Sequence, residues 1–379
     1  MQTYDFAVIG GGVFGAWTAW HLRRAGASVL LADAWGPAHS RASSGGESRI
    51  IRMGYGADEI YTRMAMRSLP QWQALFDRGG ERLLHRTGVL WVARRGDPYS
   101  EATRQTLVRA GAPFEIVQSS ELARRYPQMR IAEEVFGIFE PESGALLARR
   151  AVAAVVREAV SQGVDWRLAP ATLAPAPAVR SSTGDPIHAG AFIFACGPWL
   201  PKLFPVLLGT RIRPTRQEVF FFSPPADDPR FTPTQLPVWI DFTDSRRPYG
   251  FPDLEARGVK LAFDRHGPDF DPDTGDRRLG RESLADARRF LAERFPDLRD
   301  APLNEFRVCQ YENTASGDFL IDRHPEWPNV WLVGGGSGHG FKHGPAVGEY
   351  VTDLILHGGA PEPRFALAAA GQSGIRTVH

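Results

Sequence analysis

Two residue types are so rare in this chain of 379 residues that each copy is a candidate for chemistry. One of only two cysteines, Cys309, lies in EFRVCQYENT (305–314), among polar and aromatic neighbours rather than those of a thiol filling an apolar core. The lysines are Lys202, Lys260 and Lys342, against 41 arginines. A nucleotide bias of the source genome accounts for the scarcity, but a retained lysine supplies a compact ammonium where a broad guanidinium does not fit.

The neighbours of each rare residue indicate what it can do. Lys260 lies in GVKLAFD, inside an apolar strand, where an unpaired ammonium would cost several kcal/mol. It is therefore either a working cation or an edge-strand lysine that reaches water. Lys342, in GHGFKHGP, follows a glycine turn at the start of a helix. Lys202 is expected on a solvated helix, and Cys196, which ends an apolar strand, is expected to be a packing residue.

The strongest motif lies at the N-terminus, where YDFAVIGGGVFGAWTAWHLRRAGASVLLADAW is typical of a strand, a glycine turn, a helix and a second strand. Gly10, Gly12 and Gly15 form G-x-G-x-x-G, and Asp33 follows about 20 residues later. The glycines let the backbone approach a pyrophosphate at a helix N-terminus, and Asp33 can accept hydrogen bonds from a ribose. A plain βαβ unit with a glycine-rich turn is the alternative, but this context favours a bound dinucleotide.

Later segments favour FAD over NAD. After Asp33 the chain enters HSRASSGGESRIIRMGYG (39–56), a loop that can line a pyrophosphate and a flavin ring. Rossmann-like character returns in RRAVAAVVREAVSQGVDWRL (149–168), AGAFIFACGPWLPKL (189–203) and NVWLVGGGSGHGFKHGPAVGEYVTDLILHGG (329–359), the last with Pro345 near the start of its helix. A nucleotide domain assembled from the start, middle and end of the chain suits FAD.

The intervening segments predict a second, sheet-based domain. Residues 86–145 read as short strands and turns, and residues 214–305 contain strand-like TRQEVFFFSPP, QLPVWIDF and GVKLAFD with a helix near ESLADARRFLAERF. We therefore predict an α/β fold with a Rossmann-like FAD-binding domain in three parts (1–85, 146–213, 306–379). The substrate domain, in two parts (86–145, 214–305), is built on an antiparallel sheet with helices.

Composition excludes several classes of protein. With 44 basic and 43 acidic residues the net charge is +1, and no basic run points to a nucleic acid or to an electrostatic membrane attachment. Two cysteines fit a reducing cytoplasm better than a disulfide framework. The start MQTYDFAVIGGG has no basic stretch before its apolar run, so we expect neither a signal peptide nor a membrane span.

Two apparent metal motifs are incomplete. His339 and His343 have helical ligand spacing, but adjacent glycines place them in a turn and no third ligand is evident. DFDPDTGD (269–276) begins like a calcium loop, yet Pro272 interrupts it and position twelve is Gly280. We therefore expect no metal. No serine or cysteine elbow with a nearby histidine and acid predicts hydrolysis.

The chain resembles the monomeric sarcosine oxidase and N-methyltryptophan oxidase group, within the D-amino-acid-oxidase-like flavoproteins. The resemblance runs nearly end to end. Besides the N-terminal fingerprint it rests on SRIIR (48–52), FEPESGALL (139–147), YGFP (249–252), VKL (259–261), VCQY (308–311) and SGHGFK (337–342). It implies FAD, oxidation of a secondary amine to an imine, and return of the electrons to O2 as hydrogen peroxide. It also implies a small amino acid as substrate and a monomer.

The resemblance assigns roles to individual residues. It implies that the sulfur of Cys309 is bonded to the flavin 8-methyl, that Lys260 stabilises negative charge on reduced oxygen, and that Arg52 and Lys342 clamp the substrate carboxylate. Arg49 lies near the flavin or forms a structural ion pair, and Tyr249 and Tyr311 line the substrate cavity. The cofactor-binding residues implied are Gly10, Gly12, Val13, Phe14, Gly15, Asp33, Ser43, Ser44, Ser48, Arg49, Thr172, Cys309, Gly336, Gly338, His339, Gly340, Phe341 and Lys342.

At two positions the chain departs from the sarcosine oxidases, which carry histidines facing the substrate where this chain has Gly45 and Asp264. Gly45 removes bulk. Asp264 shares a strand face with Lys260, so it either pairs with that lysine or faces the substrate and attracts a cationic or hydroxyl-bearing group. His266 can also fill the vacated space. The departures predict a substrate bulkier or more polar than sarcosine.

Three functions remain compatible with the sequence. The first is an amine oxidase. The second is a flavin dehydrogenase that passes electrons to a quinone or protein carrier, against which a lysine at the oxygen-reactive position argues. The third is a flavoprotein domain serving RNA modification, against which the near-neutral charge argues. Peroxide formation with air as the sole electron acceptor distinguishes the first from the others.

Overall fold

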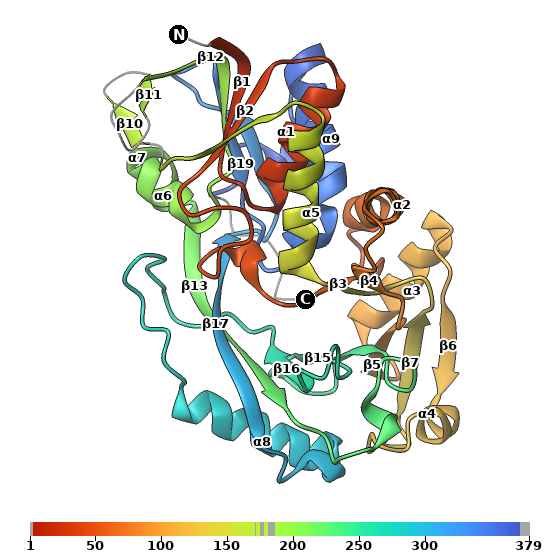
Figure 1. Cartoon of the computed structure of the whole chain (residues 1–379). Coiled ribbons are helices and arrows are strands. Elements are labelled where there is room, and N and C mark those ends of the chain that lie inside the picture. The colour runs from red at the N-terminus through yellow and green to blue at the C-terminus, as the bar shows by residue number, and fades with distance from the viewer. Residues whose placement is uncertain (1–2, 171, 175–177, 181–185, 372–379) are drawn as a thin grey trace.

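Two eight-stranded sheets organise the molecule, and strands β13 and β17 of the second sheet extend toward the first (Figure 1). The structure is a computed structural model that describes residues 3–170, 172–174, 178–180 and 186–371. Because β13 and β17 reach from the second sheet toward the first, residues on them can contribute to sites that both sheets build.

The first sheet has a parallel centre in which β19, β12, β1, β2 and β9 are successive neighbours. Its parallel strands end at one edge, next to Gly10, Asp33, Ala195 and Gly334, where ligands bind in open α/β sheets. The strands of this sheet are β1 (Thr3–Ile9), β2 (Val29–Asp33), β9 (Asp165–Leu168), β10 (Thr172–Ala174), β11 (Ala178–Arg180), β12 (Pro186–Phe194), β18 (Leu320–Arg323) and β19 (Val330–Gly334).

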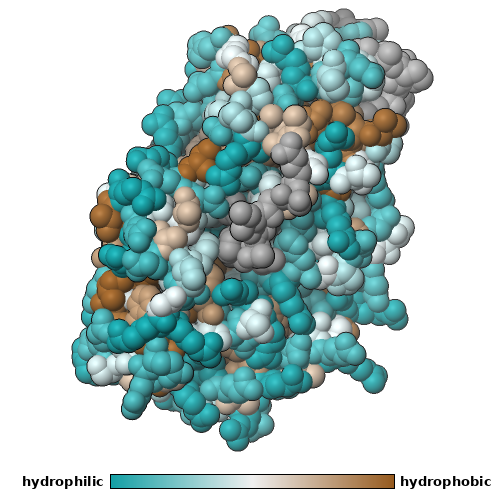
Figure 2. Space-filling model, turned by 180° about the vertical axis from the view of Figure 1, so that it is seen from behind, coloured by the Kyte–Doolittle hydropathy of each residue, from teal (hydrophilic) through white to brown (hydrophobic). Residues whose placement is uncertain are grey.

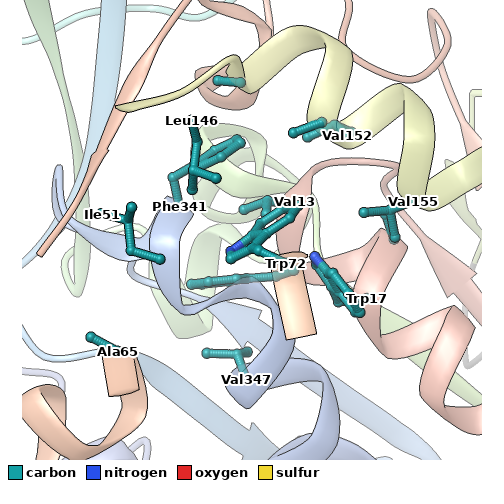
Figure 3. Packing of buried hydrophobic residues seen from close by; sticks show 14 of the residues in the cluster. Val13, Trp17, Ile51, Ala65, Trp72, Leu146, Val152, Val155, Phe341 and Val347 are labelled. Atoms are coloured by element: carbon teal, nitrogen blue, oxygen red, sulfur yellow. The ribbon is translucent and has the colours of Figure 1, made fainter. Parts of the chain in front are cut away.

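Helix α1 packs on this sheet, and three further helices pack with it around two tryptophans (Figure 3). Trp17 and Trp72 are fully buried and meet edge to face with ring centroids 5.1 Å apart. The Trp72 ring also stacks on Phe341 at 5.7 Å, and its Nε1 donates to the carbonyl of Lys342 at 3.0 Å. The core thereby fixes the segment that carries Lys342. The helices are α1 (Val13–Arg24), α2 (Glu59–Gly79), α5 (Ala148–Ser161) and α9 (Gly344–His357).

The second sheet is antiparallel except for one pair. Its order is β17, β13, β16, β15, β14, β5, β7, β6, and only β14 with β5 runs parallel among these neighbours. The predicted antiparallel sheet is therefore mixed at its middle, where segments from the two halves of the chain join. Its strands are β5 (Val89–Arg94), β6 (Glu115–Gln118), β7 (Val135–Glu140), β13 (Ile212–Phe222), β14 (Val238–Asp241), β15 (Pro248–Phe251), β16 (Val259–Phe263) and β17 (Leu303–Thr314).

The prediction of only short strands and turns for residues 86–145 is wrong in part, because α3 (Pro98–Ala110) and α4 (Ser119–Arg125) lie there. Local chemistry explains α3. The Asp97 side chain accepts from Ser100 N, Pro98 occupies the first turn, and Gly111 ends the helix with φ 70°. The helix predicted near ESLADARRFLAERF is confirmed as α8 (Arg281–Arg294).

Shorter elements complete the chain. A three-stranded sheet joins β3 (Arg49–Ile51), β8 (Gly144–Leu146) and β4 (Leu84–His85), and α6 (Leu200–Leu203) and α7 (Pro205–Leu208) follow β12. The 3-10 helices are η1 (Ser43–Gly45), η2 (Gly197–Trp199), η3 (Pro229–Phe231), η4 (Pro296–Leu298), η5 (Gly340–His343) and η6 (Pro363–Phe365). No helix within the described ranges is long and apolar enough to cross a membrane. On the face in Figure 2, hydrophobic residues form small patches among hydrophilic ones.

Candidate active site

A long cavity opens where the parallel strands of the first sheet end. The turn after β1 requires glycine, since Gly10 has φ +107° and a Cβ there would lie 2.4 Å from the Ala195 carbonyl oxygen. Thirteen of the predicted cofactor residues line this cofactor cavity. They are Gly10, Gly12, Val13, Phe14, Asp33, Ser43, Ser44, Arg49, Cys309, Gly336, Gly338, Gly340 and Phe341.

The residues at one end of the cofactor cavity fit a dinucleotide. Gly12 is the N-cap of α1, and the nearest atom to a Cβ there is Ser44 Oγ at 3.6 Å, so the glycine leaves space for a ligand beside the helix N-terminus. Asp33 holds the turn, because its Oδ2 accepts from Gly11 N at 2.7 Å and its Oδ1 from Trp35 N at 2.9 Å. Gly15 packs on the Gly10 carbonyl rather than lining the cavity.

The other end of the cofactor cavity holds Cys309. The sulfur lies 3.3 Å from a guanidinium nitrogen of Arg49, which is further held by the carbonyl of Ser43 at 2.7 Å. Burial lowers the pKa of Arg49, but Cys309, Tyr249 and other neighbours raise it on balance, so the arginine stays a cation. Cys196 also lines the cavity, where its sulfur donates to the Ile9 carbonyl at 3.2 Å.

A second cavity, which we call the substrate cavity, adjoins the first. Arg49, Tyr311, Gly338 and Phe341 line both. The predicted residues Ser48, Arg52, Tyr249, Lys260, Asp264, His339 and Lys342 line the substrate cavity as well. The two cavities therefore share a wall at the Cys309 end, so a flavin ring near Cys309 would face the residues expected to act on substrate.

Arg52 is fixed between two aromatic rings. Its guanidinium carbon lies 4.2 Å from the ring centroid of Tyr55 and 4.7 Å from that of Trp91, and the side chain is only 2% exposed. The contacts between the guanidinium and the two rings are favourable cation–π interactions. They also restrict the rotation of the Arg52 side chain, so the guanidinium is already oriented before a ligand binds. Glu140 supports the arrangement, because it accepts from Trp91 Nε1 at 2.7 Å and from the backbone N of Gly54 at 3.0 Å.

Tyr55 also holds the second cation. Lys342 Nζ donates to the Tyr55 hydroxyl at 2.8 Å and to the His339 carbonyl at 2.9 Å. The same hydroxyl lies 2.7 Å from His343 Nε2. His339 and His343 thus belong to a buried network around Tyr55, and no cluster of potential metal ligands occurs in the part of the chain that the structure describes.

Lys260 is almost fully buried on β16. Its Nζ donates to the carbonyl of Ser48 at 2.8 Å and to Ser48 Oγ at 3.1 Å, and it lies 4.2 Å from the ring centroid of Phe251. Burial, and then the nearby Arg49 cation, lower the pKa of Lys260 well below its usual range. This shift favours the neutral amine, and an anion that forms next to Lys260 would favour its protonated, cationic form.

Two tyrosines and an aspartate line the substrate cavity together. The Tyr311 hydroxyl donates to Asp264 Oδ1 at 3.0 Å. Burial and the Asp264 charge raise the pKa of Tyr249 to about 12, and burial and Tyr249 raise the pKa of Tyr311 well above its usual value. Both phenols are therefore neutral hydrogen-bonding groups at physiological pH.

Three other residues that the sequence placed near the substrate or the cofactor are Gly45, His266 and Thr172. A Cβ on Gly45 would lie 1.9 Å from the His39 carbonyl oxygen, so this glycine is required by backbone packing rather than by the substrate. His266 is exposed, with its ring centroid 6.4 Å from that of Tyr311. Thr172 is described only as a backbone position in β10, and its side chain lies outside the described part.

The loop that resembles a calcium site binds a lysine instead. Lys202 Nζ donates to Asp271 at 2.7 Å and to Asp273 at 2.5 Å, and this third lysine is about two-fifths exposed on α6. The carboxylates of Asp271 and Asp273 in this loop are thus paired with Lys202.

Sequence reasoning missed Glu312, which lines the cofactor cavity beside Tyr311. Its Oε1 accepts from Gly336 N at 3.2 Å, whereas Oε2 is buried without a hydrogen-bond partner among the described residues. Burial raises the pKa of Glu312 to about 7. Tyr55, Trp91 and Glu140 were missed too, because aromatic residues and acids are too common for their type alone to signal a site.

The split nucleotide-binding sheet, its glycine turns and the adjoining charged cavity define an oxidoreductase that binds a dinucleotide. A family model described as FAD dependent oxidoreductase matches residues 5–354. The monomeric sarcosine oxidase of Bacillus sp. (strain B-0618) is 31% identical over 369 residues, covering 94% of this chain and 93% of that protein. The N-methyl-L-tryptophan oxidase of Salmonella heidelberg (strain SL476) is 28% identical over 374 residues, covering 93% and 95%.

Solved structures share the fold. The L-proline dehydrogenase from P. horikoshii superposes with a TM-score of 0.83 over 97% of both chains at 21% identity. The Amadoriase I Ser67Cys/Pro121Cys mutant from Aspergillus fumigatus has a TM-score of 0.81 at 20% identity, over 97% of this chain and 90% of that one. The chain belongs to the FAD dependent oxidoreductase family, and the predicted resemblance to the sarcosine oxidase group is confirmed.

Proposed function

We propose that the protein is an FAD-dependent amine oxidase that oxidises a secondary amino acid, N-methylated or cyclic, to an imine and reduces O2 to hydrogen peroxide. One observation carries the proposal. The cavity that holds the buried cations Arg52 and Lys342 shares a wall with the cofactor cavity at the Cys309 end and also contains Lys260. Carboxylate recognition and stabilisation of reduced oxygen are thus available around one flavin position.

The residues of this chain take distinct parts. Arg52 and Lys342 bind the carboxylate, which leaves the amine toward Tyr249, Tyr311 and Asp264. FAD held in the cofactor cavity by the turn after β1 and by Cys309 would supply the two-electron chemistry that links the amine to O2. Lys260 provides a preorganised positive charge where oxygen becomes negative.

The proposal also covers how the flavin is attached, the oligomeric state of the protein and its place in the cell. We expect the flavin to be bonded to the sulfur of Cys309, which lines the cofactor cavity beside Arg49. The protein is expected to act as a monomer in the cytoplasm, and the domain division given above stays a prediction. The near equality of basic and acidic residues fits a small amino acid rather than a nucleic acid as ligand.

The test is a screen for peroxide with air as the sole acceptor. Sarcosine, larger N-methyl amino acids, proline and pipecolate are incubated with purified protein, and peroxide and the aldehyde or imine product are measured. Each imine formed should be matched by one peroxide. Substrate oxidation that needs an added quinone or dye and yields no peroxide would make the protein a dehydrogenase.

A further inference from the structure

His343 directly follows Lys342 in the chain and is fully buried. Lys342 lines the substrate cavity, whereas His343 contacts Tyr55, the tyrosine that holds Lys342. Aromatic rings from other parts of the chain fix the histidine ring in place. Their centroids lie 5.4 Å from it for Tyr55, 5.6 Å for Tyr61 and 5.6 Å for Phe319. The ring therefore has a fixed orientation toward the Tyr55 hydroxyl.

The contacts of the Tyr55 hydroxyl determine which group donates each hydrogen. An ammonium has only hydrogens to offer, so Lys342 Nζ, at 2.8 Å, donates and the tyrosine oxygen accepts. The hydroxyl must then give its own hydrogen to another group. His343 Nε2 lies 2.7 Å from the oxygen, whereas His339 Nδ1 lies 3.4 Å from it, so His343 is the better acceptor.

His343 can accept this hydrogen only as a neutral ring whose proton is on Nδ1. Its surroundings favour the neutral form. The Arg52 guanidinium carbon lies 4.2 Å from the ring centroid of Tyr55, and Lys342 donates to the hydroxyl, so two cations are already close. His343 is also the N-cap of α9, where the helix dipole disfavours positive charge. A second proton on the ring would place a third positive charge in a buried region.

We propose that His343 is a positioning residue for the substrate carboxylate and acts through Tyr55. By accepting the hydroxyl hydrogen, it turns the lone pairs of the tyrosine oxygen toward Lys342, so the ammonium is held in place before substrate binds. The inference rests on the proposed function, in which Arg52 and Lys342 bind the carboxylate. Without an acceptor at position 343, the hydroxyl hydrogen could turn toward Lys342, where it would repel the ammonium.

The first experiment removes the acceptor and then restores it. In His343→Leu, KM for amino acids should rise about five- to tenfold, the effect of one lost hydrogen bond, while kcat and KM for matched simple amines stay largely unchanged. His343→Gln keeps an acceptor oxygen and should recover most of the loss. His357→Leu, at an exposed position of α9, is the matched control and should behave as wild type. Equal losses for amino acids and simple amines in His343→Leu would overturn the positioning role.

A double-mutant cycle with Tyr55→Phe tests whether the effect passes through the hydroxyl. In the Tyr55→Phe background, His343→Leu should raise KM for amino acids no further, because the group that the histidine orients is absent. A histidine that only packs against its neighbours would act whether or not the hydroxyl is present. Additive effects of the two substitutions would therefore overturn the proposal.

A measurement on the wild type does not require a variant that folds. Neutron diffraction from deuterated crystals of the holoenzyme should show deuterium on the Tyr55 oxygen, directed at His343 Nε2, and on His343 Nδ1. Deuterium on His343 Nε2 would overturn the proposal.

Binding of tetrahydrofuran-2-carboxylate, a proline analogue without an oxidisable nitrogen, distinguishes failure of this inference from failure of the proposed function. Flavin absorbance reports its dissociation constant, which should be about five- to tenfold higher in His343→Leu than in wild type. A wild type that oxidises no secondary amino acid would overturn the oxidase function. An unchanged dissociation constant in His343→Leu would overturn the positioning role, whatever the wild type oxidises.

Discussion

At the scale of single residues, Lys260 is a buried basic side chain that we propose stabilises reduced oxygen. Its pKa is lowered by burial and by Arg49, so negative charge that forms beside it would stabilise the protonated, cationic form of the side chain. We expect Lys260→Met to leave anaerobic flavin reduction by substrate nearly intact and to slow reoxidation by air roughly 10²–10³-fold, by analogy with oxyanion donors. Stopped-flow absorbance of the two half-reactions checks this. Lys202→Met, which removes an exposed lysine, is the matched control. Equal slowing of both half-reactions would make Lys260 a structural residue.

Arg52 and Lys342 are organised by a single tyrosine. Arg52→Ala removes one cation of the clamp and should weaken binding of amino acids, but not of the corresponding simple amines, by about 2–5 kcal/mol. Tyr55→Phe keeps the ring under Arg52 but removes the hydroxyl that accepts from Lys342. It should raise KM for amino acids by a smaller factor, corresponding to about 1–3 kcal/mol, with kcat largely kept. Steady-state kinetics with matched amino acid and amine pairs decide the outcome. Equal losses for both substrate types would contradict the clamp.

Asp264 is the residue at which this site departs from sarcosine oxidases. It accepts from the Tyr311 hydroxyl and lines the substrate cavity, so a carboxylate faces the position of the substrate amine or side chain. We expect kcat/KM to be higher for larger or more polar secondary amino acids than for sarcosine, and Asp264→His to reduce that preference roughly tenfold, since one charge-assisted hydrogen bond is worth about 1.5–3 kcal/mol. If sarcosine is the best substrate of the wild type and the substitution leaves the ranking unchanged, Asp264 does not set specificity.

At the scale of elements, β17 brings an acid as well as Cys309 and Tyr311 into the cofactor cavity. Burial raises the pKa of Glu312 from 4.5 to about 7, with the Gly336 N–H opposing part of the effect. Because the folded pKa is the higher one, the stabilisation linked to this proton is fully present below about pH 4.5 and is lost as pH rises through about 7. A shift of this size corresponds to on the order of 3 kcal/mol.

The Glu312→Gln variant tests this linkage, since glutamine has a similar shape and does not ionise. The thermal stability of wild type relative to Glu312→Gln should fall between pH 5 and pH 8. Only the change with pH is diagnostic, because the glutamine amide is also buried. Glu282→Gln, at an exposed position of α8, is the control and should show no such trend. A wild-type minus variant difference that is constant from pH 5 to pH 8 would mean that Glu312 does not titrate in this range.

Elements with strong local signals could be predicted from the sequence, and those set by distant contacts could not. The first βαβ unit, the strand and helix at 329–359, and α8 follow from apolar periodicity and glycine or proline punctuation. The parallel pairing of β14 with β5 joins Val238 to Val89 across about 150 positions, which no local pattern encodes. In the site, Cys309 and Lys260 stood out because their residue types are rare. Tyr55 did not, because Lys342 and His343, which contact its hydroxyl, are distant in sequence.

At the scale of the whole molecule, the cofactor cavity joins the two sheets. Its glycine turns follow strands of the first sheet, whereas Cys309 lies on β17 of the second. A flavin bonded to Cys309 and held by the turn after β1 would therefore connect both halves of the molecule. Such a ligand stabilises the entire fold, and its effect does not depend on free FAD as long as the bond is intact.

Cys309→Ala should remove this connection. Trichloroacetic acid should leave yellow colour in the wild-type pellet and release it into the supernatant in the variant. Thermal unfolding should then distinguish the wild type from the variant. Added FAD should leave the unfolding midpoint of the wild type unchanged. The midpoint of Cys309→Ala should rise with FAD concentration, by an amount corresponding to about 2.7 kcal/mol at 100 times the dissociation constant. Cys196→Ala is the matched control, because Cys196 lines the same cavity and should keep its colour in the pellet. Wild-type flavin that appears in the supernatant, or a wild-type midpoint that rises with FAD, would show that the cofactor is held without a covalent bond.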